Sequence, residues 1–219
     1  MVTLTIIVVT SIISFVAFYS KALVENFIFI PSAANKGQWY RFITHGLLHA
    51  DLGHLFFNMF ALYLFGVEIE RVFCDVFGDG KGKLFYVLLY LTSLIVAILP
   101  TYFKQKYNYD YRSLGASGGV SAIVFAYILV YPMSFMGIVF VPVFLPAFLF
   151  GIIYIAVSIY LDKKQSQNIN HLAHITGGIY GIVYIFIVFL VFARINLFSF
   201  FIQNIHISSV NDLIRFGYN

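Results

Sequence analysis

The sequence predicts an all-α membrane protein built as a bundle of six transmembrane helices. Three observations lead to this fold class. The 219 residues are 61% hydrophobic and only 10% charged, whereas soluble domains have about 25% charged residues. The mean hydropathy is +0.92. The apolar residues form separate runs, most of them near the roughly 20 residues that a helix needs to cross the hydrocarbon, and they lack the alternation of a membrane barrel strand.

Six apolar runs follow one another along the chain. They cover residues 3–20, 52–72, 84–103, 114–131, 146–161 and 170–192. An even number of crossings would place both termini on one side of the membrane. The net charge of +4 is spread over the connections, which argues against a nucleic-acid partner. The single cysteine, Cys74, excludes an intrachain disulfide.

The connections differ in character. Residues 21–51 form a long segment with Trp39 and Tyr40, which are aromatic residues of the kind that anchor a chain at the membrane interface. Residues 131–146 hold three prolines, so we expect a short, partly buried connection there rather than a helix.

The last part of the chain is aromatic and moderately polar. It follows the sixth apolar run and carries no motif that indicates chemistry. The sequence therefore predicts a six-helix domain over residues 1–193 and a C-terminal interfacial tail over residues 194–219.

Polar side chains within the apolar runs mark the candidate site, because such groups are costly in hydrocarbon and usually functional. His54 and Asn58 are four residues apart, so they share one face of the second helix. Ser117 lies between glycines at the start of the fourth run, and His174 lies near the start of the sixth. Successive spans alternate in direction, so these three helices enter from the same side. All four side chains should lie at one depth, about 5 to 10 Å below the entry surface.

Small residues predict which helices touch. Gly118, Ala122 and Ala126 form a stripe on the fourth helix, and Gly177 and Gly181 form a G-x-x-x-G pattern on the sixth. Small residues let helix backbones approach closely within a membrane. Contact between these two stripes would bring the serine hydroxyl within reach of the histidine ring.

A serine and a histidine at one depth indicate acyl transfer. Ser117 would be the nucleophile and His174 the general base that takes its proton. No Asp or Glu lies at this depth in any span, which indicates a dyad rather than a triad. The oxyanion of the tetrahedral intermediate needs hydrogen-bond donors, and His54, Asn58 and the serine backbone N–H are the candidates. Gly115 would let the substrate carbonyl approach.

Together these motifs resemble the rhomboid family of intramembrane serine proteases, over about residues 39–190. The residues that carry the resemblance are Trp39-Tyr40-Arg41, His49 with His54 and Asn58, Gly115-x-Ser117-Gly118, and Ala173-His174 with Gly177 and Gly181. The resemblance implies a six-helix rhomboid bundle that cleaves transmembrane protein substrates near the outer end of their helix, with no cofactor and no metal.

The same resemblance implies residue roles. Ser117 would be the nucleophile and His174 the general base, and His54 with Asn58 would line the oxyanion hole. Glu70 and Arg71 resemble the structural polar residues of the family, beyond the second helix.

The resemblance also implies an orientation in the membrane. The N-terminus would be cytoplasmic and the site would open outward, among membrane lipid, with a bacterial cytoplasmic membrane as the expected location. In this arrangement Lys and Arg are more numerous outside than inside, against the positive-inside rule. We give the family pattern more weight, because most of the outer charges lie in the two long loops nearest the site.

One position departs from the family pattern. Many relatives have an aromatic residue four positions after the serine, where it stacks on the histidine, whereas this chain has Ser121. We therefore expect the orientation of His174 to come from elsewhere, for example from a hydrogen bond.

Other classes of protein fit the sequence less well. A zinc protease would have the motif H-E-x-x-H, and no histidine here is followed by glutamate. His45, His49 and His54, or His171 with His174, remain possible metal ligands. The alternative from a different class is a catalytically silent rhomboid-like protein that binds transmembrane helices. Such proteins typically lack the serine or the histidine, and both are present here.

Overall fold

The computed structural model describes residues 1–137, 141–164 and 170–217. Six long helices lie where the apolar runs predicted them: α1 (Val2–Ala17), α5 (Leu52–Phe77), α6 (Asp79–Gln105), α7 (Ser117–Val130), α8 (Ala147–Lys163) and α9 (His171–Val188). Helix α9 continues as a π-helical turn, η2 (Phe189–Ala193). By length and composition, α5, α6 and α9 with η2 can cross a membrane, and α1 and α7 are shorter apolar helices. The predicted helical membrane bundle is confirmed.

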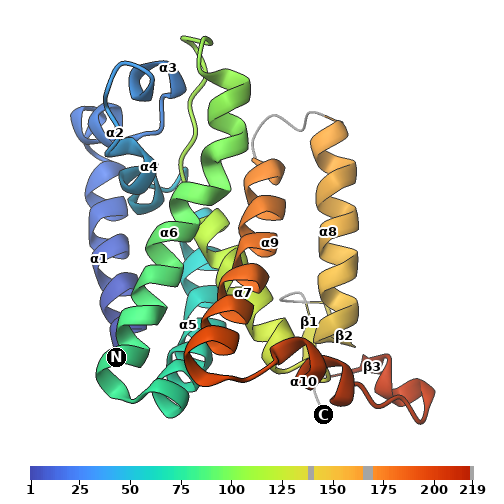
Figure 1. Cartoon of the computed structure of the whole chain (residues 1–219). Coiled ribbons are helices and arrows are strands. Elements are labelled where there is room, and N and C mark those ends of the chain that lie inside the picture. Colours follow the sequence, from blue (N-terminus) through green and yellow to red (C-terminus); the bar gives the residue numbers. More distant parts are fainter. Residues whose placement is uncertain (138–140, 165–169, 218–219) are drawn as a thin grey trace.

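Helix α7 lies at the centre of the bundle (Figure 1). It packs against α5, α6, α8 and α9, and most of its residues are buried, among them Ala122, Ile123 and Ala126. Helix α1 lies at one edge against α5, and α8 lies at the opposite edge against α9. Ser117, the first residue of α7, therefore begins a helix that is enclosed by the rest of the bundle.

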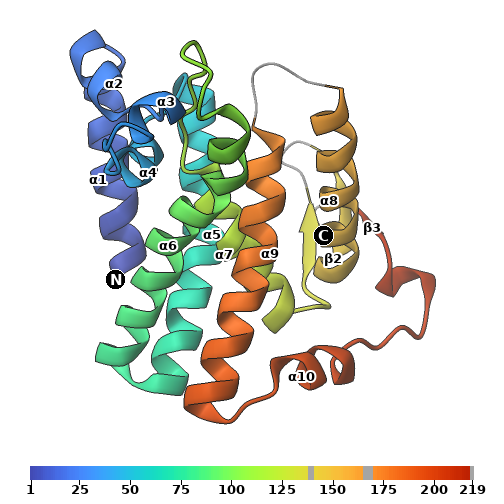
Figure 2. The same cartoon turned by 45° about the horizontal axis from the view of Figure 1, so that its top comes forward.

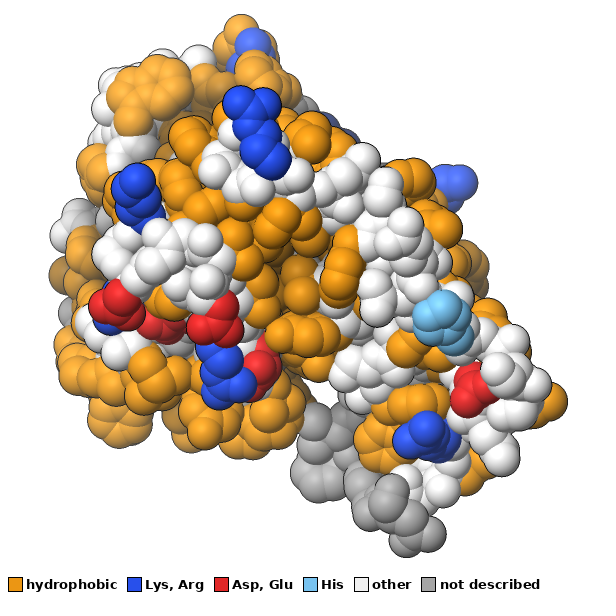
Figure 3. Space-filling view, turned by 60° about the horizontal axis from the view of Figure 1, so that its bottom comes forward, with side chains coloured by type: hydrophobic (Ala, Val, Ile, Leu, Met, Phe, Trp, Pro, Cys, Tyr) orange, Lys and Arg blue, Asp and Glu red, His pale blue; other side chains and the backbone are white. Residues whose placement is uncertain are grey.

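Hydrophobic side chains cover the outside of the helices. Phe56 on α5, Ile152 on α8 and Phe192 after α9 are each more than half exposed. Figure 3 shows one end of the bundle, where charged side chains gather among hydrophobic ones. Exposed apolar sides with charges at an end suit a bundle surrounded by lipid. The chain is an integral, multi-pass membrane protein.

Short helices connect α1 to α5 and cover one end of the bundle. They are α2 (Lys21–Phe27), α3 (Pro31–Ala34), α4 (Arg41–Thr44) and the 3-10 turn η1 (His45–Leu47). Figure 2 shows them beside the end of α1 and the upper part of α6. Trp39 and Tyr40 are exposed on this segment, which agrees with an interfacial position.

Arg41 holds this connecting segment together. Its guanidinium group is buried and donates hydrogen bonds to the carbonyl groups of Glu25 and Ile28, at 2.8 and 2.6 Å. Its Nε also donates to the side-chain oxygen of Gln38, at 2.6 Å. Hydrogen bonds from a charged donor are stronger than neutral ones, so one side chain ties α4 to the end of α2.

A small antiparallel sheet, which the sequence did not predict, follows α7. Strands β1 (Phe135–Gly137) and β2 (Val143–Pro146) pair with Phe135 opposite Pro146, and β3 (Arg215–Phe216) pairs with β2. Strands β1 and β2 lie beside α8. The predicted connection over residues 131–146 is therefore a hairpin, of which residues 138–140 lie outside the described part.

The predicted C-terminal tail contains α10 (Leu197–Gln203), the 3-10 turn η3 (Val210–Asp212) and β3. Helix α10 packs against α7. Residues 218–219 of the tail lie outside the described residues.

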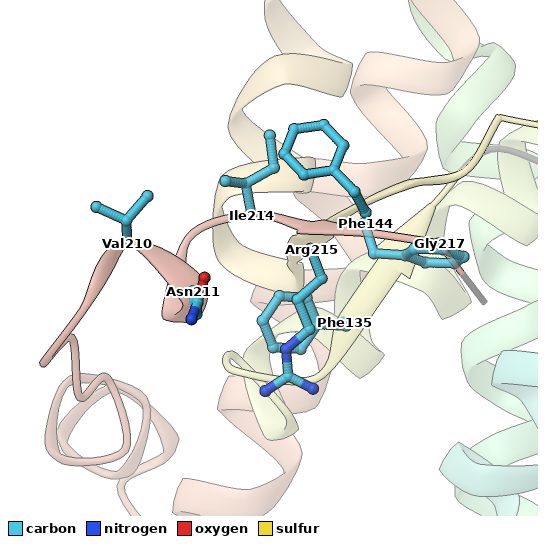
Figure 4. A pocket seen from close by; sticks show the side chains of 8 residues that line it. Phe135, Phe144, Val210, Asn211, Ile214, Arg215 and Gly217 are labelled. Carbon is cyan, nitrogen blue, oxygen red and sulfur yellow. The ribbon is translucent and has the colours of Figure 1, made fainter. Parts of the chain in front are cut away.

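A cavity of about 830 Å³ opens beside this tail. Figure 4 shows the guanidinium group of Arg215 against the ring of Phe135, 3.8 Å from its centre. The described lining comes from β1, β2 and the segment that follows α10. The cavity is thus separate from the predicted site, although it is larger than the cavity beside His174.

Glu70 joins α5 to the start of α1. Its buried carboxylate accepts hydrogen bonds from the backbone N–H groups of Val2 and Thr3, at 2.7 and 2.8 Å, and from the Thr3 hydroxyl, at 2.7 Å. The first N–H groups of a helix have no partner within the helix and carry its positive end, so a carboxylate there stabilises it. Helix α5 ends at Phe77 rather than near residue 72, so Glu70 lies within the helix.

Replacing Glu70 by alanine is expected to lower the free energy of unfolding by about 3 kcal/mol, because it leaves buried N–H groups without partners. Glu68→Ala is the matched control, because Glu68 makes an exposed ion pair with Arg71 at 3.1 Å and such pairs contribute about 0 to 1 kcal/mol. Unfolding in mixed detergent micelles measures both variants. Equal losses in the two would contradict a specific role for Glu70.

Candidate active site

Ser117 is the first residue of α7, and a bend in the chain at Gly115 places it there. Gly115 has a φ of +121°, a conformation that residues with a side chain rarely adopt. A Cβ atom at this position would also lie 2.8 Å from the His54 ring. The Gly115 N–H donates to the His45 carbonyl at 3.0 Å, so the connecting segment supports this bend.

The position at a helix N-terminus gives Ser117 free backbone donors. The first N–H groups of a helix have no partner in the helix itself. They also lie at the positive end of the helix dipole, which favours a negative oxygen nearby. The serine side chain is partly exposed, so a substrate can reach it.

His174 lies in the first turn of α9, and its ring contacts the serine. Its Nε2 lies 2.7 Å from the Ser117 hydroxyl oxygen. Asn170 caps α9 by accepting from the Ala173 N–H at 3.0 Å, and its amide donates to Thr101 of α6 at 2.9 Å. The turn that carries His174 is therefore fixed to a neighbouring helix.

Close packing of α7 on α9 sets this distance. A Cβ atom on Gly177 would lie 2.1 Å from the Gly118 carbonyl oxygen, and one on Gly181 would lie 2.1 Å from the Ala122 carbonyl oxygen. The predicted contact between the two stripes of small residues is confirmed. No larger residue fits at these two glycines unless the helices move apart.

His54 faces the same space from α5. Asp51 caps this helix by accepting from the His54 N–H at 2.7 Å. The Ala50 N–H donates to His54 Nδ1 at 3.3 Å, so the neutral ring carries its proton on Nε2. That nitrogen lies 3.1 Å from where a Cβ on Gly115 would be. The ring can therefore offer an N–H donor beside the residues that precede Ser117.

Asn58 lies one turn further along α5 and is buried. Its amide donates to the His54 carbonyl at 2.9 Å, within its own helix. The structure thus places Asn58 beside His54, but it gives no hydrogen bond from Asn58 to Ser117 or to His174.

The other predicted histidines have structural contacts. His45 Nδ1 lies 2.9 Å from the Arg41 carbonyl, and His49 Nδ1 lies 2.8 Å from the Ser14 hydroxyl of α1. Burial lowers the pKa of His45 to about 4, and burial together with the neighbouring His54 lowers the pKa of His49 to about 3. Both rings are therefore neutral at physiological pH. Among the described residues, no group of three or more His, Cys, Asp or Glu side chains is arranged to hold a metal ion.

Comparison with known proteins shows which family the chain belongs to. Residues 36–191 match the model of the Rhomboid domain. The chain belongs to the rhomboid family. RHOMBOID-like protein 12, mitochondrial, of Arabidopsis thaliana is 29% identical over 171 residues, which are 74% of this chain and 50% of that protein. Rhomboid-like protein 11, chloroplastic, of the same plant is 28% identical over 168 residues, 70% of this chain and 54% of that protein.

A rhomboid relative named as a protease matches a shorter part. Rhomboid protease GluP of Bacillus subtilis is 32% identical over 85 residues, which are 39% of this chain and 14% of that protein. The chain thus spans about half or less of the length of these rhomboid relatives.

Tyr154 on α8 contacts the candidate site and is a residue that sequence reasoning missed. Its ring stacks on the His174 ring, with centres 6.3 Å apart and planes 24° apart. Its hydroxyl lies 3.0 Å from the Ser121 hydroxyl. Three other aromatic residues of α8, namely Phe148, Phe150 and Tyr160, lie within six positions of Tyr154. The sequence does not show which face of α8 meets the bundle, so it does not single out Tyr154.

A cavity of about 470 Å³ lies between α8 and the hairpin and reaches His174. Its lining is mostly apolar and includes Met136, Val143, Ile153 and Val157. We take this cavity as part of the site, rather than the larger one beside Arg215, because His174 lines it.

Proposed function

We propose that this rhomboid protein is an intramembrane serine endopeptidase that cleaves membrane-anchored substrates near the outer end of their transmembrane helix. The observation that carries the proposal is the 2.7 Å contact between His174 Nε2 and the Ser117 hydroxyl at the start of an apolar helix. Among the described residues, no carboxylate makes a hydrogen bond to His174. The proposed catalytic unit is therefore a Ser–His dyad.

The geometry supports acyl transfer in two stages. In the first, Ser117 Oγ forms a bond to the carbonyl carbon of the scissile peptide, its proton passes to His174 Nε2, and the carbonyl electron pair moves onto oxygen. His174 then gives the proton to the leaving nitrogen as the C–N bond breaks, which leaves an ester on the serine. In the second stage, His174 takes a proton from water and the resulting hydroxide attacks the ester carbon. The bond from that carbon to Ser117 Oγ then breaks, His174 returns the proton to Oγ, and the second product leaves with a free carboxyl group.

The donors around Ser117 would stabilise the oxyanion of each tetrahedral intermediate. We assign the backbone N–H of Ser117 and the Nε2–H of His54 to this role, with Asn58 as a third donor that must first leave the His54 carbonyl. A Cβ atom on Gly115 would lie 2.8 Å from the His54 ring, so the glycine lets that ring stay close to the segment that leads to Ser117. Such donors act strongly because they are fixed before the reaction.

The proposed substrates are transmembrane proteins that reach the site from the surrounding lipid. The apolar cavity beside His174 suits apolar side chains of the substrate. We propose a bacterial cytoplasmic membrane as the location, with the site opening outward, as the resemblance to the family implies; one similar protein, rhomboid protease GluP, comes from the bacterium Bacillus subtilis.

Reaction with a fluorophosphonate probe tests the proposal. Purified protein in detergent is expected to be labelled, and Ser117→Ala is expected to abolish labelling while the protein stays folded. Labelling that persists in Ser117→Ala would place the reactive group elsewhere. A folded wild-type protein that is not labelled would instead favour a helix-binding protein without catalysis.

Replacing Asn58 by alanine is expected to reduce cleavage rather than abolish it, because other donors remain. Loss of one oxyanion donor costs roughly 100-fold in kcat. A transmembrane reporter substrate measures the rate, and Ser117→Ala sets the background. If Asn58→Ala cleaves at the full rate, the Asn58 amide of the wild type only donates to the His54 carbonyl and does not stabilise the oxyanion.

A further inference from the structure

The contact between Tyr154 and His174 joins α8 to the proposed catalytic histidine. The two rings are stacked, with their centres 6.3 Å apart and 24° between their planes. Tyr154 lies 33 positions beyond Ser121 in the sequence, on a helix at the edge of the bundle. The aromatic contact with His174 therefore comes from a different helix than the one that carries Ser117.

Two residues of α7 hold the Tyr154 ring in place. The Ser121 hydroxyl lies 3.0 Å from the Tyr154 hydroxyl, and Ser121 is buried. The Phe125 ring meets the Tyr154 ring edge-on, with centres 5.7 Å apart. Ser121 and Phe125 are four residues apart on one face of α7, so they hold the ring from its hydroxyl end and from one side.

A histidine that acts as a general base must be held in one orientation. In a Ser–His–Asp triad the carboxylate does this through a hydrogen bond to the second ring nitrogen. No carboxylate of the described residues makes such a bond to His174, so rotation of its ring must be limited by packing. A flat aromatic ring stacked on the imidazole limits this rotation, because turning the imidazole would bring its edge into the neighbouring ring.

We propose that Tyr154 is the residue that positions His174 and that Ser121 holds Tyr154 in place through the hydrogen bond between their hydroxyl groups. This inference rests on the proposed dyad. In this chain a small polar residue on α7 and an aromatic residue on α8 together do what a single aromatic residue on α7 could do alone. The orientation of the base therefore depends on how α8 packs against α7 and α9.

Substitutions at Tyr154 test this role. Tyr154→Leu removes the ring, and we expect kcat on a transmembrane reporter to fall roughly 10-fold to 100-fold through misplacement of the base, with KM changed by less than about 3-fold. Tyr154→Phe keeps the ring and should restore kcat to within about 5-fold of wild type. Tyr160→Leu is the matched control, because Tyr160 lies on the same helix and is 56% exposed. It should cleave at the wild-type rate.

The NMR signal of the His174 ring provides a readout that a loss of stability alone would not move. Stacking under Tyr154 should shift its ring protons upfield in the wild type and in Tyr154→Phe, and Tyr154→Leu should abolish the shift. His174→Ala assigns the signal. The wild-type measurement stands even if Tyr154→Leu does not fold.

The outcomes separate this inference from the proposed function. If the fluorophosphonate probe labels the wild type but Tyr154→Leu has an unchanged kcat, the positioning role of Tyr154 is wrong and the proposed function stands. An unshifted His174 signal in the wild type would also overturn the positioning role. A folded wild type that the probe does not label would overturn the proposed function and this inference with it.

Discussion

Replacing His174 by alanine is expected to lower the rate of cleavage of a transmembrane reporter by about 1,000-fold or more. Without the imidazole, the Ser117 hydroxyl loses the 2.7 Å contact through which its proton would leave. Ser117→Ala should cause a loss of the same size. The double variant should be no slower than either single variant, because the two groups act in one step.

His206→Ala is the control for this experiment. His206 is exposed and lies in the tail that follows α10, so its loss should leave the rate unchanged. Circular dichroism and size-exclusion chromatography of each variant establish that the fold is retained. A His174→Ala variant that is folded and cleaves at more than about a tenth of the wild-type rate would contradict the dyad.

Replacing Gly177 by valine is expected to destabilise the bundle by about 3 kcal/mol or more, because overpacking of a close contact forces the backbones apart. The first added carbon alone would lie 2.1 Å from the Gly118 carbonyl oxygen. The residue beside Gly118 is Ser117, so cleavage should be lost together with stability. The thermal midpoint in detergent and the rate of cleavage measure the two effects.

Gly80→Val is the matched control, because it makes the same substitution at a glycine that has free space beside it. A Cβ atom on Gly80 has nothing within 4 Å, in the first turn of α6. The free energy of unfolding of this variant should lie within about 1 kcal/mol of the wild-type value. An unchanged thermal midpoint in Gly177→Val would show that the contact between α7 and α9 is not as close as described.

The helices and the contact between them could be predicted because both depend on simple rules. A membrane requires long apolar runs, so the runs near residues 52–72, 84–103 and 170–192 identify α5, α6 and α9. Alternating directions put Ser117 and His174 at one depth, and glycines on both helices indicated contact. The hydrogen bond between their side chains is present in the structure. The catalytic roles of the two residues stay predictions.

Other features could not be predicted, for physical reasons. Strands β1 and β2 are three and four residues long, too short for a periodic pattern, and they lie in an apolar segment with prolines. The contact of Tyr154 with His174 depends on the rotation of α8. That helix is apolar on all sides, so its sequence does not indicate which face meets the bundle.

The position of Glu70 was expected to be structural, but its partner was not foreseen. A carboxylate in an apolar helix is usually read as pairing with a cation, and Arg71 follows it directly. In the structure, Arg71 instead forms an ion pair with Glu68, and Glu70 accepts hydrogen bonds from backbone N–H groups. Every residue except proline has a backbone N–H group, so the sequence does not show which of these groups bind a carboxylate.

The bond between Glu70 and the start of α1 also has a consequence for biosynthesis. Glu70 follows Thr3 by 67 residues. At about 5 to 20 residues per second, the ribosome needs roughly 3 to 13 s to make that stretch. Throughout this interval the first turn of α1 has to find other partners for its N–H groups, in water, lipid headgroups or the insertion machinery. Helix α1 is synthesised before α5, yet its first turn is locked into place only after Glu70 of α5 has been made.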